Sequence, residues 1–449
     1  MTIQPTLAVG IMAGPSIDFS LGSPYQTGDL LLPPGTYSAG RSKACLWLQG
    51  MGISCKAENQ LILTPAEDSG YFDLKDVTIG IAFHWEQKED QRFTGGLTFI
   101  PEGENIRAIN TVLLEDYLKS VISSEMSPTA SADLLKAHAV ISRSWLLAQM
   151  EKRKQIAGSG KAYQTAVITP EEVVRWYDRE DHLHFDVCAD DHCQRYHGIT
   201  KIMTDKAIGA VEATSGEILM AGEEICDARF SKCCGGISES FEKVWEPVPK
   251  SYLTAITDRN PPGMPPVVDL RPEQEATAWI LSQPEAFCNN SNPEILRQIL
   301  PDFDRKTTDF FRWKVEYNQE ELAELIRKRS GIDFGKIIRL EPLERGFSGR
   351  IIRLKISGTK QTIVVGKELE IRKWLSPSHL YSSAFVVEYG EMTGEIPGIL
   401  ILRGAGWGHG VGLCQIGAAV MGELNFTYRE ILAHYFKNAE LIKWYEVNK

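Results

Sequence analysis

The spacing of apolar residues changes once in the first third of this chain, and that change limits what it can fold into. Up to about residue 100, apolar and polar residues alternate in short stretches such as LILTP (61–65), separated by turn segments such as PPGTY (33–37). Alternation with period two is typical of strands that bury one face. From about residue 112 the spacing becomes helical. The sequence therefore predicts a β-rich N-terminal region followed by helices.

Two helices are expected after this change. In the first, Leu114, Leu118 and Val121 recur at helical spacing, and Pro128 is expected to end the helix. The second begins near Ser131, a suitable N-cap, and closes on basic residues that suit the negative end of a helix.

The remaining chain has three further patterns and no internal repeat. Residues 273–335 are predicted to be largely helical, and residues 336–400 return to β-like alternation. A glycine-rich loop at 404–412 leads into a last helical region at about 414–435. A Pro-containing stretch near 258–272 marks a predicted boundary.

Composition excludes several classes of protein. The 449 residues carry a net charge of −11, which gives no basis for electrostatic capture of nucleic acid or of an anionic membrane. The longest apolar runs are far shorter than the roughly 20 residues that span a bilayer. The first basic residue is Arg41, so no secretory signal is visible. The chain is therefore expected either to stay in the cytoplasm or to begin after a removed leader.

The segment HLHFDVCADDHC contains His182, His184, Cys188, His192 and Cys193. Two thiolates and up to three imidazoles within twelve residues suit tetrahedral zinc. The alternatives are a disulfide between the two cysteines or a pair of reduced structural thiols. Nine cysteines cannot all pair, because the number is odd.

Two distant segments carry a family resemblance. Residues 114–148 (LEDYLKSVISSEMSPTASADLLKAHAVISRSWLLA) resemble the helical signature of SpoIID/LytB proteins, and residues 404–436 (GAGWGHGVGLCQIGAAVMGELNFTYREILAHYF) resemble their C-terminal signature. Between them, HCQRYHGI and FSKCCGGISES stand where the family has a Gln-containing turn and a Gly-Gly segment. Four motifs in the family's order are far more specific than GWGHGVG alone.

The resemblance implies an α+β fold, with a helical catalytic core, flanking β-rich subdomains and an inserted α/β segment. We divide the chain into a β-rich region (1–100), a core with the zinc segment (101–260), an inserted helical region (261–345) and a C-terminal part that completes the core (346–449). The implied location is the cell envelope.

The activity implied by the resemblance is lytic transglycosylation. Such an enzyme cuts the MurNAc–GlcNAc bond of peptide-stripped peptidoglycan and leaves a 1,6-anhydro end. One acid protonates the glycosidic oxygen, and its conjugate base then takes the proton of the sugar's own 6-hydroxyl, so a single glutamate is enough. The family position assigns this role to Glu125. Without the resemblance, an ordinary surface glutamate would be the better interpretation.

Basic residues are expected to bind the substrate. Lys136 and Arg143 lie seven residues apart, hence on one helical face, where they are either a solvated surface or a site for the free lactyl carboxylate of MurNAc. We expect one of them to face away from Glu125, because two adjacent cations would favour its ionised form. Lys232, in FSK, is a further candidate contact.

Other candidates complete the implied site. Trp407 could stack on a sugar ring, and His409 either contacts substrate or holds a tight turn. The zinc ligands by resemblance are His182, Cys188, His192 and Cys193, with His184 as a substitute for one of them. Four protein ligands would make the zinc structural.

Three hypotheses follow. The first is a lytic transglycosylase with peptidoglycan glycan strands as its partner. The second is a non-catalytic protein on the same scaffold that binds peptidoglycan or enhances a cell-wall amidase. The third is a zinc hydrolase, which two thiolate ligands make less favourable.

Overall fold

A computed structural model describes most of the chain. The described residues are 4–42, 45–80, 86–127, 129–159, 164–176, 182, 184–190, 192–201, 204–262, 268–299 and 309–446. Pro128, which was expected to end the first helix, lies outside them. None of the described helices combines the length and the apolar character needed to cross a membrane.

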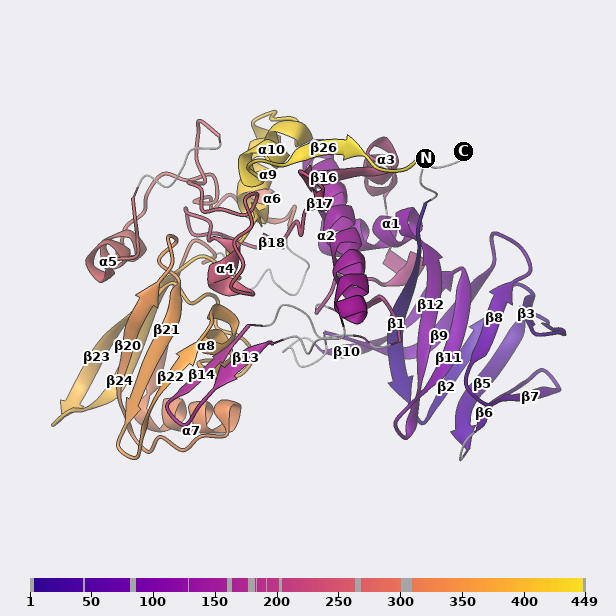
Figure 1. Ribbon diagram of the computed structural model, residues 1–449, viewed down its shortest axis with the longest axis horizontal. Helices are drawn as coiled ribbons and strands as arrows, with labels where there is room; N and C mark the ends of the chain where they lie inside the picture. Colours follow the sequence, from indigo (N-terminus) through magenta and orange to yellow (C-terminus); the bar gives the residue numbers. More distant parts are fainter. Residues whose placement is uncertain are drawn as a thin grey trace.

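The first twelve strands form a two-sheet β-sandwich, drawn in indigo and violet in Figure 1. One sheet has the order β15-β1-β12-β11-β8-β3-β4, and the other has the order β10-β9-β2-β5-β6-β7. In β2, every second residue is buried, as the alternation predicted. The strands are β1 (Thr6–Gly14), β2 (Ser16–Leu21), β3 (Tyr25–Thr27), β4 (Leu30–Leu32), β5 (Gly35–Ser42), β6 (Cys45–Gly50), β7 (Ile53–Ala57), β8 (Leu61–Pro65), β9 (Tyr71–Ile79), β10 (Gln87–Thr94), β11 (Gly96–Glu102), β12 (Asn105–Leu113) and, from further along, β15 (Val187–Cys188).

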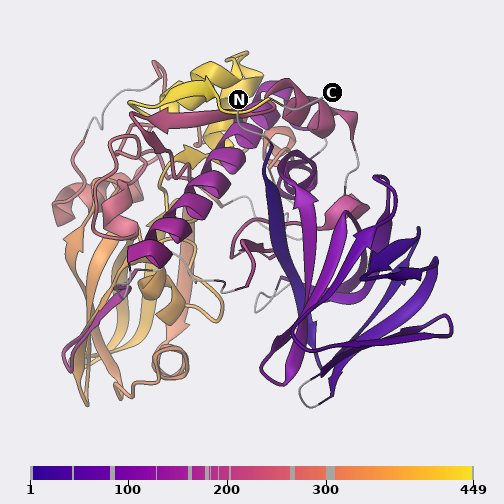
Figure 2. The same cartoon turned by 45° about the vertical axis from the view of Figure 1, so that its right-hand side comes forward.

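A helical part follows the sandwich and shares its hydrophobic core. Its centre is the long helix α2, which lies between the two β-rich lobes of the molecule in Figures 1 and 2. The C-terminal segment covers one end of α2. The elements are α1 (Leu114–Glu125), α2 (Ala132–Ser159), a 3-10 turn η1 (Gly198–Lys201), α3 (Asp205–Ala213), β16 (Glu217–Ala221), β17 (Glu224–Ile225), β18 (Phe230–Ser231), α4 (Phe241–Val244), β25 (Leu413–Cys414), α9 (Gln415–Glu423), α10 (Tyr428–Tyr435) and β26 (Glu440–Lys443).

A second β-rich lobe has a separate core. It combines a five-stranded sheet, β13-β14-β22-β21-β20, with a three-stranded sheet, β19-β24-β23. Two strands from an earlier part of the chain, β13 and β14, belong to this lobe, because β14 pairs in parallel with β22. The elements are β13 (Ala166–Ile168), β14 (Glu172–Arg175), α5 (Glu273–Leu281), β19 (Arg312–Asn318), α7 (Gln319–Ser330), β20 (Ile337–Arg345), β21 (Ile351–Gly358), β22 (Thr362–Gly366), α8 (Glu368–Trp374), β23 (Phe385–Thr393) and β24 (Ile396–Ala405). The short helix α6 (Pro293–Leu296) instead packs against α9 in the helical part, and its Leu296 belongs to the first core.

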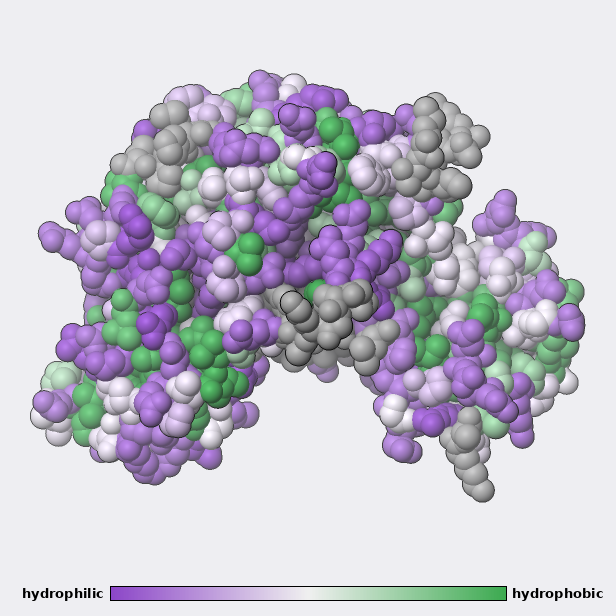
Figure 3. All heavy atoms as spheres, in the orientation of Figure 1, coloured by the Kyte–Doolittle hydropathy of each residue, from purple (hydrophilic) through white to green (hydrophobic). Residues whose placement is uncertain are grey.

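The two lobes stand apart below the helical part, so the space-filling view has the outline of an arch (Figure 3). The glycine-rich loop lies where the second lobe meets the helical part. It follows β24 and leads into β25, and it pairs with the chain after β18 through bridges from Cys233 to Trp407 and from Glu239 to Val411.

The expectation of a helical catalytic core is wrong. Of the described residues, 39% are in strands and 25% in helices, and the strands form many sheets. Within residues 101–260, the nine-residue strand β12 is followed by helices that alternate with strands of two to five residues, among them β15, β16 and β18. Strands this short are joined by backbone pairing to distant segments, and they are too brief to show a period of two.

Candidate functional site

Glu125 is the last residue of α1 and is partly buried. Its Oε1 accepts a hydrogen bond from the backbone N–H of Arg195 at 3.2 Å. Among the hydrogen bonds of the described residues, none engages Oε2. The carboxylate is therefore anchored at one oxygen, and the side chain as a whole is partly accessible.

The segment that supplies this N–H runs along α1 and α2. The backbone N–H of His197 donates to Ser120 Oγ at 3.2 Å, and Tyr117 Oη donates to Gln194 Oε1 at 3.4 Å. Gln194 also donates to the carbonyl oxygen of Ser142 on α2. These contacts fix residues 194–197 against both helices and thereby position Glu125.

Directly before this segment, the structure brings together His182, Cys188, His192 and Cys193. Their candidate ligand atoms all lie within 4.8 Å of one another. His182 Nε2 and His192 Nδ1 are each 3.4 Å from Cys193 Sγ, and hydrogen bonds from Cys193 and the two histidines lower the pKa of Cys188 to about 2. This donor set could hold a metal ion. His184 is exposed and lies outside the group.

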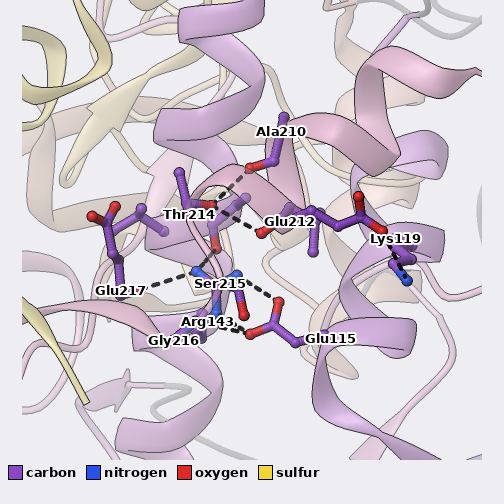
Figure 4. A network of polar contacts seen from close by, with 12 residues as sticks. Glu115, Lys119, Arg143, Ala210, Glu212, Thr214, Ser215, Gly216 and Glu217 are labelled. Carbon is purple, nitrogen blue, oxygen red and sulfur yellow. Dashed lines mark hydrogen bonds and ion pairs between the residues drawn. The ribbon is translucent and has the colours of Figure 1, made fainter. Parts of the chain in front are cut away.

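Arg143 is fully buried, and its guanidinium is occupied (Figure 4). Nε and Nη2 donate to the two carboxylate oxygens of Glu115 at 3.0 and 2.7 Å, and Nη1 donates to the carbonyl oxygen of Glu217 at 3.0 Å. Gly216 N–H and Tyr445 Oη complete the shell around Glu115. This arrangement places Arg143 in an interior ion pair, away from Glu125.

Lys136 is partly buried and lies 5.8 Å from the centre of the Tyr428 ring. It therefore faces α10. Lys232 is also partly buried, and its ammonium donates to the carbonyl oxygen of Ile299 at 2.9 Å. The neighbouring carbonyl, of Gln298, accepts from the backbone N–H of Ser127, two residues after Glu125. Residues 298 and 299 thus connect Lys232 with the end of α1.

Two aromatic rings flank Trp407 in the glycine-rich loop. Their centres, in Phe310 and Tyr381, are 4.7 and 4.4 Å from that of the indole. Trp407 and Tyr381 are partly exposed, so part of this aromatic group reaches the surface.

His409 stabilises the turn of the same loop. Its Nδ1 accepts from the backbone N–H of Val411 at 3.0 Å, and its ring meets Trp245 edge-on. Burial and the nearby positive charges of Arg229, Arg372 and Arg350 hold the pKa of His409 well below its usual range. The histidine is therefore neutral and serves here as a hydrogen-bond acceptor.

Sequence reasoning missed His138. It lies on the buried face of α2, where Ser142 Oγ is 3.3 Å from Nδ1 and Gln415 Nε2 is 3.3 Å from Nε2. Burial and the charge of Lys232 lower the pKa of His138 to about 3. A histidine among the apolar residues of a helix was the available signal, but its partner Gln415 lies 277 positions away.

A second compact group contains Cys234, Asp258, Cys288 and Cys414, and all four side chains are buried. Burial alone would raise the pKa of Cys414. Hydrogen bonds from Cys233, Cys234, Cys288 and the backbone N–H of Gly417 outweigh it and hold the pKa well below its usual range. This group also could hold a metal ion, and the sequence analysis did not anticipate it.

Comparison with known families identifies part of the chain. Residues 102–220 match the family model described as Stage II sporulation protein, SpoIID. The chain carries a SpoIID-family domain. Glu125 and the group at 182–193 fall inside that domain, which links this part of the chain to cell-wall function.

Two further similarities extend beyond the SpoIID-family domain. Residues 239–412 match a domain of unknown function, DUF8618, which includes the second β-rich lobe from α5 to β24. An uncharacterized protein of Brachyspira hyodysenteriae is 25% identical over 362 residues, which cover 80% of this chain and 74% of the relative.

Proposed function

We propose that this chain is a lytic transglycosylase that cuts peptidoglycan glycan strands, with Glu125 as the acid and base. The observation that supports it most directly is the geometry of that carboxylate. Oε1 is fixed by the N–H of Arg195, and the side chain remains partly accessible at the end of α1. Several surface acids of this chain instead have their carboxylates engaged by lysine or arginine, as Asp116 is by Lys119.

In the proposed reaction, protonated Glu125 gives its proton to the glycosidic oxygen as the bond to the MurNAc anomeric carbon breaks. The carboxylate then takes the proton of the MurNAc 6-hydroxyl as that oxygen bonds to the same carbon. The products are a 1,6-anhydro end and a new hydroxyl on the leaving sugar. No water is consumed, and Glu125 returns to its starting protonation state. The exposed part of Trp407 and Tyr381 offers an aromatic surface for a sugar ring.

We further propose that the group at 182–193 binds zinc. Two thiolates and two imidazoles fit its tetrahedral preference, and four protein ligands would leave no position for a reactive water. His182, Cys188, His192 and Cys193 would then fix the segment that begins at Gln194. Through the N–H of Arg195, that segment holds Glu125 in place.

The test is a Glu125→Gln variant assayed on purified glycan strands without stem peptides. Gln can still accept from Arg195 but cannot transfer the proton, so turnover should fall about 10²–10⁴-fold with little change in melting temperature. Asp116→Asn is the matched control, because it neutralises another acid on α1 that already pairs with Lys119. Products are weighed by mass spectrometry in water enriched in ¹⁸O.

Each outcome has a separate meaning. Anhydro ends without ¹⁸O support transglycosylation, whereas ¹⁸O at the new end would show hydrolysis. A wild-type protein that cuts nothing but accelerates an added cell-wall amidase would replace the enzyme with the enhancer of the same family. A Glu125→Gln variant that cuts at the wild-type rate would remove Glu125 from the mechanism.

A further inference from the structure

The buried group of Cys234, Asp258, Cys288 and Cys414 draws its members from four separate parts of the chain. Cys234 follows β18, Cys414 ends β25, and Asp258 and Cys288 lie in connections before and after α5. Each side chain is at most 2% exposed, and the four candidate ligand atoms lie within 4.8 Å of one another. We propose that these four residues form a second, structural zinc site.

The spacing of the atoms fits one zinc ion better than a disulfide. A tetrahedral zinc ion with Zn–S bonds of about 2.3 Å holds its sulfur ligands roughly 3.8 Å apart, and a carboxylate oxygen somewhat closer to each sulfur. Cys234 Sγ lies 3.5 Å from Cys288 Sγ and 3.4 Å from Asp258 Oδ2. A disulfide would need about 2.05 Å between the sulfurs, and the cysteines are free.

Asp258 is oriented as a metal-binding carboxylate usually is. Its Oδ1 accepts from Tyr435 Oη at 2.7 Å and lies 3.4 Å from His434 Nε2, both on α10. Its Oδ2 points to Cys234 Sγ and also accepts from the backbone N–H of Cys288 at 3.1 Å. Such outer hydrogen bonds orient ligands in known metal sites.

The packing around Asp258 leaves no room for a larger residue at the start of α9. A Cβ placed on Gly417 would lie 2.3 Å from Tyr435 Oη and 2.6 Å from Asp258 Oδ1. The close approach of this helix to the carboxylate therefore depends on glycine.

A zinc ion would also balance the charge that its own binding creates. In the structure Cys234 donates its S–H to Asp258 Oδ2. Zinc binding would release the thiol protons and leave three thiolates and a carboxylate, a charge that a dry interior opposes without a metal. The guanidinium of Arg312 supplies one positive charge close to Cys233, Cys234 and Cys288. Its N–H groups donate to backbone carbonyl oxygens, which are those of Gly235, Trp279, Ser282 and Phe311. A zinc ion would supply two further positive charges.

The proposed ion would stabilise the base of the glycine-rich loop. Cys414 lies two residues after Gly412 and is the N-cap of α9, and Cys234 is adjacent to the residue that pairs with Trp407. A site closed by four protein ligands binds no reactive water, so its role is to join these segments.

The test measures zinc in the full-length protein purified with zinc and under reducing conditions. Elemental analysis should give two zinc ions per chain. X-ray absorption at the zinc edge should give about 2.5 sulfur ligands per zinc on average, because five thiolates are shared by two ions. This measurement needs no variant, so it remains decisive if a substitution prevents folding.

Variants then assign the ions. Cys288→Ser/Cys414→Ser should lose one zinc, Cys188→Ser/Cys193→Ser should lose the other, and Cys226→Ser, at a buried cysteine outside both groups, should keep both. One zinc with three sulfur ligands, lost in the first variant, would also support the second site. One zinc with two sulfur ligands, or a Cys234–Cys288 disulfide found by mass mapping, would overturn it. Each of these results is independent of whether the protein cuts glycan.

Discussion

At the residue scale, α1 carries two glutamates with opposite surroundings. Glu115, in the first turn, is buried and accepts from Arg143, Gly216 and Tyr445. Glu125, in the last turn, is partly accessible and accepts from one backbone N–H. The first is therefore suited to holding the fold together, and the second to meeting a ligand.

This difference predicts the effect of Arg143→Met. Removing the guanidinium leaves the buried carboxylate of Glu115 without its charged partner, which typically costs about 3–5 kcal/mol of unfolding free energy. Urea unfolding measures this cost, and Lys136→Met on the same helix, where the cation only faces a ring, is the matched control. If Arg143→Met kept its stability but no longer cut peptide-stripped glycan, Arg143 would be a substrate contact, as its sequence position suggests.

At the element scale, the glycine-rich loop is held by an arginine from the second lobe. Arg350, just before β21, is fully buried and donates to the carbonyl oxygens of Gly408 and Cys234 at 3.0 and 3.1 Å. A Cβ at Gly410 would lie 2.3 Å from the centre of this guanidinium. The loop and the arginine therefore fit each other closely.

We expect Arg350→Ala to loosen the loop selectively. Hydrogen exchange of residues 404–412 should rise by at least tenfold, because three hydrogen bonds to loop and neighbouring backbone are lost. Arg353→Ala is the control, since that side chain on β21 is partly exposed and pairs with Glu172 rather than with the loop. Equal exchange in the two variants would contradict the role of Arg350.

Local sequence signals predicted some of these elements well. Leu114, Leu118 and Val121 are buried in α1, and Ser131 Oγ accepts from Leu134 N–H at the start of α2, as an N-cap does. The helical region expected at about 414–435 contains two helices, α9 and α10, which are separated where Asn425 has a φ of 63° and Thr427 begins a new capping box.

The remaining features depend on residues that are distant in sequence. The stretch expected to be helical at 273–335 contains β19, which becomes a strand by pairing with β24 some eighty positions later. The group at 182–193 was visible because its members are close in sequence. Asp258 and Cys414 were not linked, since no spacing rule connects residues so far apart.

At the scale of the whole molecule, segments that are far apart in the sequence pair with and contact one another. Strand β26 pairs with β16, and Tyr445 near the C-terminal end reaches Glu115 on α1. Four histidines of the described residues are wholly or partly buried and have a shifted pKa. His138, His197, His379 and His409 all have a lowered pKa, in each case chiefly because burial disfavours the charged ring.

These histidines predict that mild acid destabilises the fold. The unfolded chain binds their protons near the ordinary pKa of about 6.5, whereas in the folded protein His138 binds one only near pH 3. The free energy of unfolding therefore has its full value above about pH 6.5. It decreases as the pH falls, by up to ~1.4 kcal/mol per pH unit for each such histidine.

The variant His138→Gln removes one of these histidines and leaves an amide beside Ser142 and Gln415. Between pH 6 and 5, urea unfolding of this variant should depend less steeply on pH than unfolding of the wild type, and exposed His184→Gln is the control. Identical slopes for all three proteins would mean that His138 is protonated in the native interior, which would require a nearby anion to replace the amide of Gln415 as its partner.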